Sequence, residues 1–196
     1  MKKYYCALGW QHNIPSHLQH FEEVAYSLAD KGYTLRTIPT KGASQSFIKG
    51  AQRYCKNRRK NIRDYIEVFL PLQSFNGFYS EQQGFYNVQN FKDLERRDRL
   101  VKKFSKHTVV REAEMRLINT IPYMVLGEEL KIPPSFFITD IIIYDMDSEG
   151  NIVDGQGING QAIRTLKSLS PKTQIFNFDY IEHRQRINSL LYYAKK

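Results

Sequence analysis

The stretch YTLRTIPTKGASQSFIKGA, residues 33–51, decides the fold of this chain. Its first residues favour a β-strand, which Pro39 ends because proline has no N–H for a strand ladder. Small residues follow, and a helical pattern then places Phe47 and Ile48 on one side. A strand, a turn and a helix in this order direct free helix N–H groups to the carboxyl edge of a sheet, where an anion can bind. An ordinary strand-to-helix turn with a serine cap is the alternative interpretation.

The segments before this stretch complete a β-α-β unit. Residues 4–8 form a short apolar run that stops at Gly9, which is typical of a buried strand. Apolar residues then recur at helical spacing after Ser16, a candidate N-cap, until Gly32 closes the helix. Because such crossovers are right-handed, the two strands are expected to be parallel neighbours.

Further strands are expected at residues 65–70, 136–144 and 173–178, the second of them central in the sheet. Helices are expected at 88–104, from Glu112 to an end or bend near Pro122, and at 181–193. Residues 72–87 are rich in glycine and aromatic residues and indicate a long loop, either a functional lid or a surface loop held by its aromatics. A second glycine-rich loop, 153–164, leads into a helix that ends near Ser170. The pattern predicts an α/β fold, a Rossmann-like three-layer sandwich with a mostly parallel sheet of about five strands.

Composition indicates a globular protein with an anionic partner. The chain has 196 residues, 41% of them hydrophobic, and a formal net charge of +9. No apolar run approaches the roughly 20 residues that span a bilayer, so we expect no membrane partner and a cytoplasmic location. Two cysteines, Cys6 and Cys55, fit a reducing compartment and lack metal-ligand spacing, so neither a metal nor another cofactor is predicted.

Much of the positive charge lies in one run. Between residues 53 and 63 the basic side chains are Arg53, Lys56, Arg58, Arg59, Lys60 and Arg63. A solvated helix end is one interpretation, and a nucleic-acid contact or an interface to another protein are the others.

Three loops are expected at the carboxyl edge of the sheet, after residues 4–8, in 37–44 and in 154–161. Ligands bind at that edge in open α/β sheets. The ligand-binding candidates are Gly9, Trp10, Gln11, Arg36, Thr37, Thr40, Gly42, Ser44, Asn76, Gly157, Gly160, Gln161 and Arg164. Arg36 and Arg164 are the candidates for pairing with a phosphate, and Trp10 for stacking on a base.

The chain resembles a known superfamily. The residues that carry the resemblance are Gly9, Gly32-Tyr33-Thr34-Leu35-Arg36, Gly42-Ala43, Gly50-Ala51, Glu67-Val68-Phe69-Leu70-Pro71, Phe75-Asn76-Gly77, Val125-Leu126-Gly127, Gly160-Gln161-Ala162-Ile163-Arg164 and Ile175-Phe176-Asn177-Phe178, in that order. In this order they look like the phage and bacterial branch of the SLOG superfamily, the Rossmann-like fold shared by DNA-processing protein A and the LOG nucleotide phosphoribohydrolases. The resemblance covers roughly residues 4–178 and implies a phage protein that binds a nucleotide or nucleotide-derived ligand. It also implies a SLOG-like domain at 1–180, with a loop and helical insertion at 72–132, followed by a C-terminal helix at 181–196.

The chain departs from the family pattern where phosphate would approach. Gly9-Trp10-Gln11 stands where the family commonly has Gly-Ser-Arg, and Arg36-Thr37-Ile38-Pro39 where it has Arg-Ser-Gly-Gly. The Pro-Gly-Gly signature of the LOG hydrolases is absent. Cleavage of an N-glycosidic bond needs a carboxylate, and the candidates are Glu67, Asp145 and Asp154.

Three functions follow as hypotheses. The first is a binding module that sequesters or senses a nucleotide-derived signal in the host cytoplasm, an anti-defence role that the resemblance implies. The second is an N-glycosidase or glycosyl transferase acting on a nucleotide. The third is binding of single-stranded DNA through the basic run and the aromatic loop at 75–86. A homo-oligomer is a further expectation from the family.

Overall fold

The computed structural model describes residues 2–9, 15–104, 111–140 and 157–193. Its core is a six-stranded sheet in which every pairing is parallel, in the order β6-β3-β2-β1-β7-β8. The sheet strands are β1 (Lys3–Ala7), β2 (Tyr33–Thr37), β3 (Ile66–Leu70), β6 (Phe85–Asn87), β7 (Phe136–Thr139) and β8 (Gln174–Asn177). The α/β class and the Rossmann-like arrangement predicted from the sequence are confirmed.

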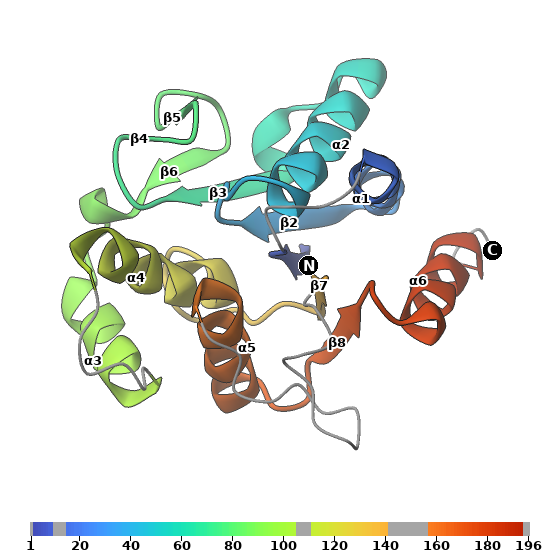
Figure 1. The fold of residues 1–196 in the computed structure, drawn as a ribbon. Coiled ribbons are helices and arrows are strands. Elements are labelled where there is room, and N and C mark those ends of the chain that lie inside the picture. The colour runs from blue at the N-terminus through green and yellow to red at the C-terminus, as the bar shows by residue number, and fades with distance from the viewer. Residues whose placement is uncertain (1, 10–14, 105–110, 141–156, 194–196) are drawn as a thin grey trace.

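Helices cover both faces of this sheet (Figure 1). The helices are α1 (Pro15–Asp30), α2 (Ala43–Arg58), α3 (Leu94–Phe104), α4 (Glu112–Leu126), α5 (Gly157–Leu169) and α6 (Ile181–Tyr193), with 3-10 turns η1 (Ile62–Asp64) and η2 (Val88–Asn90). One apolar cluster joins α1, α2 and α6 to one face, and a second joins α4 and α5 to the other. Alternate strand residues divide between the two clusters, as Tyr5 and Cys6 do, because successive side chains point to opposite faces. The result is the expected three-layer sandwich.

The first helix forms as its sequence predicts. Pro15 takes the first helical position, where its missing N–H costs nothing, so Ser16 lies inside the first turn instead of capping it. Phe21, Val24 and Leu28 are buried against the sheet. Gly32 then adopts a φ of 77°, and its N–H donates to Ala29 O at 2.9 Å, which ends the helix.

The region expected to be a long loop, 72–87, consists of turns with three short strands. A small hairpin, β4 (Ser74–Phe75) and β5 (Phe78–Tyr79), precedes β6, which pairs with β3 at the edge of the main sheet. The loop prediction was wrong at residues 85–87, because β6 has only three residues, too few to show a period of two. The sheet therefore has six strands instead of about five.

Two other boundaries differ from expectation. Helix α4 continues through Pro122 to Leu126, because the side chains around that turn, among them Ile121 and Met124, are completely buried in the second cluster. Packing there outweighs the lost backbone bond. The strand expected to be central, β7, lies next to the edge strand β8 instead, and β2 and β1 occupy the centre. The described part of β7 ends at Thr139, and residues 141–144 of the expected strand lie outside the described residues.

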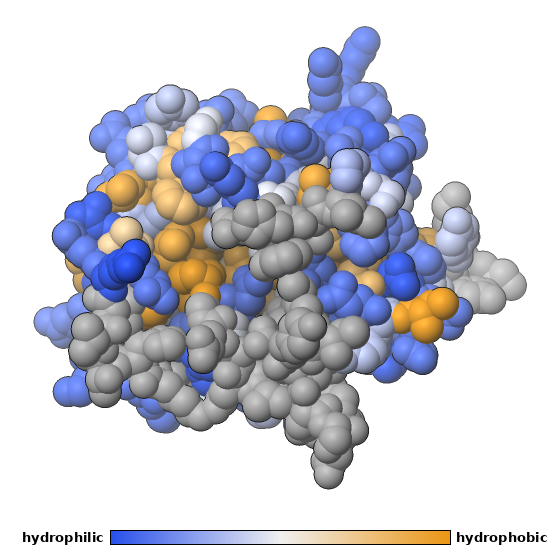
Figure 2. Space-filling view, viewed as in Figure 1, coloured by the Kyte–Doolittle hydropathy of each residue, from blue (hydrophilic) through white to orange (hydrophobic). Residues whose placement is uncertain are grey.

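The hydropathy of one face agrees with this layering. Figure 2 shows hydrophilic side chains over the exposed side of α2, with apolar side chains visible mainly between the α2 and α4 layers. No helix in the described parts of the chain is long and apolar enough to cross a membrane.

Candidate functional site

The order of the strands defines a switch point beside β1. The connection through α1 leads from β1 to β2 on one side, whereas β7 lies on the other side of β1. The chain continues from β1 to α1 on one face and from β7 to α5 on the other, and in open α/β sheets ligands bind in the crevice at such a switch point. The described residues at this place are Gly9, which follows β1, and Asp140, which follows β7.

Gly9 allows an unusually close approach of three chain segments. A Cβ atom at this position would lie 2.0 Å from Asp140 Oδ1 and 2.6 Å from Ala43 Cβ. Any side chain there would push Asp140 and the first residue of α2 away. Glycine is therefore required by packing, and the Asp140 carboxyl group is held beside the N-terminal end of α2.

Asp140 is the residue that the sequence analysis missed. Its exposed fraction is only 3%, and buried aspartates at sheet edges are uncommon outside functional or ion-paired positions. The available signal was an acidic residue directly after the apolar run FFIT, but extending that strand to residue 144 concealed it.

The turn between β2 and α2 is bonded to itself and its neighbours. Gly42 precedes the helix with a φ of 81°, and no side chain caps α2. Thr40 Oγ1 and Ser44 Oγ lie 2.8 Å apart and share a hydrogen bond, and Asn76 donates from its amide to Pro39 O at 3.0 Å. These candidates lie together at the carboxyl edge, and their polar atoms hold the turn in place.

The electrostatics of this turn differ from those of an ordinary phosphate site. The N-terminus of a helix favours negative charge, and the Asp140 carboxyl group already lies beside it. A phosphate at the same place would meet a neighbouring carboxylate and be repelled. A hydroxyl group of a ligand, in contrast, can donate to a carboxylate oxygen.

Thr37, Arg36 and Glu67 are placed elsewhere. Thr37 is fully buried, and its hydroxyl donates to Ala7 O at 2.5 Å, which joins the ends of β1 and β2. The Arg36 side chain is 3% exposed, and its Nε donates to Glu67 Oε2 at 2.7 Å. Arg36 Nη1 also donates to Ile132 O at 2.6 Å, and the guanidinium lies 3.5 Å from the centre of the Tyr4 ring. Arg36 and Glu67 thus form a pair on the α4 face of the sheet, away from the other candidates.

The last group of candidates lies on α5. This helix begins at Gly157, so Gly157, Gly160 and Gln161 are helical instead of forming a loop through residue 161. Gln161 is buried, and Arg164 Nη2 donates to its Oε1 at 3.0 Å. Burial lowers the pKa of the Arg164 guanidinium from its usual value. α5 and α2 cover opposite faces of the sheet (Figure 1).

Four candidates, Trp10, Gln11, Asp145 and Asp154, lie outside the described residues. Among the residues with described positions, no three His, Cys, Asp or Glu side chains gather as metal ligands would. No protein-family model, curated protein or solved structure matches this chain.

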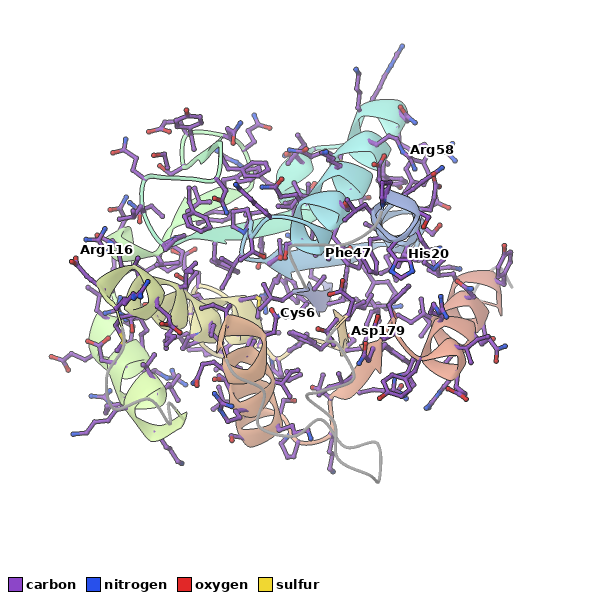
Figure 3. The ribbon with its side chains drawn as sticks, viewed as in Figure 1. Cys6, His20, Phe47, Arg58, Arg116 and Asp179 are labelled. Carbon is purple, nitrogen blue, oxygen red and sulfur yellow. The ribbon has the colours of Figure 1, made fainter. Side chains whose placement is uncertain are left out.

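The basic run lies at the opposite end of α2 from these groups. In Figure 3, Arg58 is at the far end of the helix from the sheet centre. Arg53 pairs with Glu22 at 3.0 Å and with Glu23 at 2.9 Å, and Arg58 lies 3.8 Å from Asp30. A helix of 16 residues is about 24 Å long. The run is therefore partly neutralised by α1 and remote from the crevice.

Proposed function

We propose that this chain binds a nucleotide or nucleotide-derived ligand in the crevice at the switch point of its sheet. The observation that carries the proposal is the position of Asp140, buried at the end of β7 against Gly9 and the start of α2. A buried carboxylate at this point of an α/β sheet is suited to ribose hydroxyl groups, which donate to carboxylate oxygens.

The charges suggest how such a ligand is oriented. Its sugar lies toward Asp140, since a phosphate there would be repelled. Its phosphate lies toward the N-terminal end of α5, where the free N–H groups favour negative charge, and Arg164, about two turns along the helix, adds positive charge on the same side. The sequence analysis expected an anion at the turn before α2 and named Arg36 and Arg164 as candidates for pairing with a phosphate; this proposal keeps Arg164 and moves the phosphate away from that turn.

Binding without turnover is the simplest form of this function, and sequestration of a signalling nucleotide is its proposed role. The resemblance to the SLOG superfamily supports this role. Cleavage of an N-glycosidic bond is the second candidate, and one observation favours it. Asp140 offers a buried carboxylate in the crevice, of the kind that stabilises an oxocarbenium-like centre, whereas Glu67 is engaged by Arg36.

Arg164→Ala tests the proposed orientation. We expect it to weaken nucleotide binding by about 1.5–3 kcal/mol, the value of a charge-assisted hydrogen bond. Calorimetry with a panel of nucleotides, chosen from whatever small molecule mass spectrometry finds released from the heat-denatured protein, measures the change. Lys167→Ala, one turn further along α5 and exposed, is the matched control and should bind as the unaltered chain does. Unchanged affinity in a folded Arg164→Ala variant removes Arg164 from the site.

Asp140→Asn separates binding from catalysis. Product analysis over hours with nucleotides and NAD detects free base or nicotinamide if the chain is a glycosidase. Loss of product with retained binding assigns the chemistry to Asp140. No product from the unaltered chain, together with weaker binding by Asp140→Asn, assigns a binding role only.

A further inference from the structure

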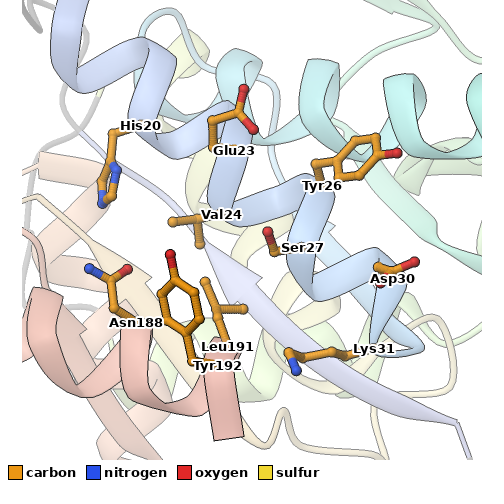
Figure 4. Close-up of a pocket in the computed structure, with 10 residues that line it drawn as sticks. All are labelled: His20, Glu23, Val24, Tyr26, Ser27, Asp30, Lys31, Asn188, Leu191 and Tyr192. Atoms are coloured by element: carbon orange, nitrogen blue, oxygen red, sulfur yellow. The ribbon is translucent and has the colours of Figure 1, made fainter. Parts of the chain in front are cut away.

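A second hollow lies away from the switch point, between α1 and α6. It consists of a cavity of about 540 Å³ near the start of both helices and a cavity of about 410 Å³ further along them. His20 and Asn188 line both cavities and so join them into one groove, which we call the α1–α6 groove. Figure 4 shows the second cavity, with Asn188, Leu191 and Tyr192 of α6 directed toward side chains of α1.

Two buried nitrogen atoms in this groove have no hydrogen-bond partner. They are His20 Nε2 on α1 and Arg184 Nε on α6, and both residues line the larger cavity. Neither side chain forms an ion pair with any residue that the structure describes. Buried polar atoms in folded proteins are nearly always hydrogen-bonded, and an exception indicates a bound water, ion or ligand. Here the two exceptions belong to residues of two different helices that line one cavity.

The start of each helix adds positive potential to the same cavity. Ser16 and His17 in the first turn of α1 line it, as do Ile181 and Arg184 in the first turn of α6. The first N–H groups of a helix have no partner within the helix and favour negative charge nearby. The first turns of two helices therefore line the same cavity as the residues that carry the unpartnered nitrogens.

The titratable groups that line the cavity are basic residues, and one acidic residue lies near them. His17, His20 and Arg184 line it, and Asp179 is the acidic group that interacts with His17 and Arg184. Burial raises the pKa of Asp179, although His17 and Arg184 oppose this. Burial, followed by Arg184 and His17, lowers the pKa of His20, while Glu23 acts in the opposite sense. Figure 3 shows His20 and Asp179 on the two sides of this space. On α6, burial and Arg186 lower the pKa of His183, and Glu182 acts in the opposite direction.

We propose that the α1–α6 groove binds an oxyanion, the carboxylate or phosphate group of a small molecule. Arg184 Nε–H and protonated His20 Nε2–H donate to its oxygen atoms, and the helix N-termini stabilise its charge. Phe21 and Phe178 form the floor of the cavity, with the His20 ring 5.3 Å from that of Phe178. The site shares no lining residue with the crevice at the switch point, so it is independent of the proposed nucleotide site.

Titration of the intact chain with inorganic phosphate tests the proposal. The signals of the His17 and His20 rings are followed by NMR at pH 6.5, with sodium chloride keeping the ionic strength constant. We expect saturable shifts of both signals and a higher pKa for His20, because a bound anion stabilises its protonated form. An equal and non-saturating response to phosphate and to chloride overturns the proposal.

Substitutions locate the bound ion. Arg184→Gln should weaken phosphate binding about tenfold or more, because it removes a charge-assisted donor. Arg186→Gln, two residues further along α6 and packed near Phe176, should bind as the unaltered chain does. Arg184→Lys keeps the charge but loses Nε–H, so it should bind with intermediate affinity even if Arg184→Gln does not fold. Equal affinity of Arg184→Lys and the unaltered chain contradicts the role of Nε–H.

Repeating the titration with sodium acetate decides the source of the anion. Binding of phosphate alone assigns a phosphorylated ligand, and binding of both assigns oxyanions in general.

Discussion

Two regions of the molecule differ in whether their buried polar side chains have hydrogen-bond partners. Along β2 and the turn that follows it, the hydrogen-bonding side chains have partners at short range: Arg36 on Glu67, Thr37 on Ala7 O, Thr40 on Ser44. In the α1–α6 groove, His20 Nε2 and Arg184 Nε are buried without a partner. Both regions contain the residue types expected at a binding site.

The difference separates architecture from binding capacity. A side chain that is already bonded can serve a ligand only by giving up that bond, which costs about 1 kcal/mol or more. A buried group without a partner gains from any ligand that supplies one. We therefore infer that the candidates around β2, which were chosen for their residue types, stabilise the fold, and that the groove can bind a ligand.

The largest effect is expected at Gly9, where the β2 turn meets Asp140. Gly9→Ala places a Cβ within 2.6 Å of Ala43 Cβ and nearer still to Asp140 Oδ1, so we expect the free energy of unfolding to fall by about 3 kcal/mol. Urea denaturation measures this. Adding Asp140→Ala removes one of the two contacts, so the double variant should lose less than the sum of the single losses. A fully additive double variant contradicts the close approach.

Removing the partner of Arg36 should have the next largest effect. Glu67→Ala leaves a nearly buried guanidinium without its carboxylate, and we expect a loss of about 2–3 kcal/mol, less than for a fully buried pair because Glu67 is partly exposed. Replacing both residues, as Arg36→Met with Glu67→Leu, should recover much of this. If Glu67→Ala is as stable as the unaltered chain but inactive, Glu67 belongs to a site after all.

A smaller loss is expected from Thr37→Val, which keeps the shape and removes the hydroxyl bonded to Ala7 O. The unpaired carbonyl and the lost bond together should cost about 1–2 kcal/mol of unfolding free energy. Thr37→Ser retains the hydroxyl and serves as the control. If Thr37→Val is as stable as the unaltered chain, the hydrogen bond of Thr37 does not stabilise the fold and the proposed difference between the two regions is contradicted.

In the groove the same kind of substitution should have the opposite sign. His20→Phe removes a buried nitrogen that has no partner and keeps the ring beside Phe178. We expect stability at pH 7 without phosphate to stay the same or to rise by up to about 1 kcal/mol. Denaturation in added phosphate should favour the unaltered chain more than His20→Phe. A clear loss of stability in His20→Phe means that the nitrogen has a structural partner.

The smallest effect concerns pH. Burial lowers the pKa values of His20 and His183 in the folded chain, so below about pH 6.5 the unfolded chain takes up protons that the folded chain does not. Stability should therefore decrease as the pH falls from 7 toward 5, and less so in His20→Phe. Asp179, whose pKa is raised, should offset part of the loss nearer pH 4. Stability that rises between pH 7 and pH 5 contradicts the direction of the histidine shifts.

The parts of the fold that depend on long periodic patterns could be predicted from the sequence. The helix closed by Gly32, the helix at 181–193 and the parallel pairing of the first two strands all follow from spacing and chirality. β6 could not be predicted, because three residues carry no periodicity and the strand is stabilised by its pairing with β3.

The candidate site was less predictable, for a different reason. Residue type and position in a loop suggested Arg36 and Glu67, but whether two side chains on neighbouring strands pair with each other depends on register, which places Arg36 opposite Glu67. The position of Asp140 could not be predicted, because it depends on the close approach of Gly9 and Ala43, which come more than 95 residues earlier in the chain. The groove involves α6, whose sequence shows an apolar face but not which polar atoms lack partners.

The position of β1 has a consequence for synthesis of the chain. Tyr5 pairs with Leu35 on one side and with Phe136 on the other, so at about 5–20 residues per second β1 remains an unpaired edge for roughly ten seconds on the ribosome. During that interval α1 and α2 can cover one face. On the other face, Cys6, Leu8 and Phe69 remain exposed until α4 and α5 have been synthesised. A nascent sheet with a bare apolar side is a substrate for chaperones, and yield from rapid overexpression should be limited at this stage more than by the stability of the finished fold.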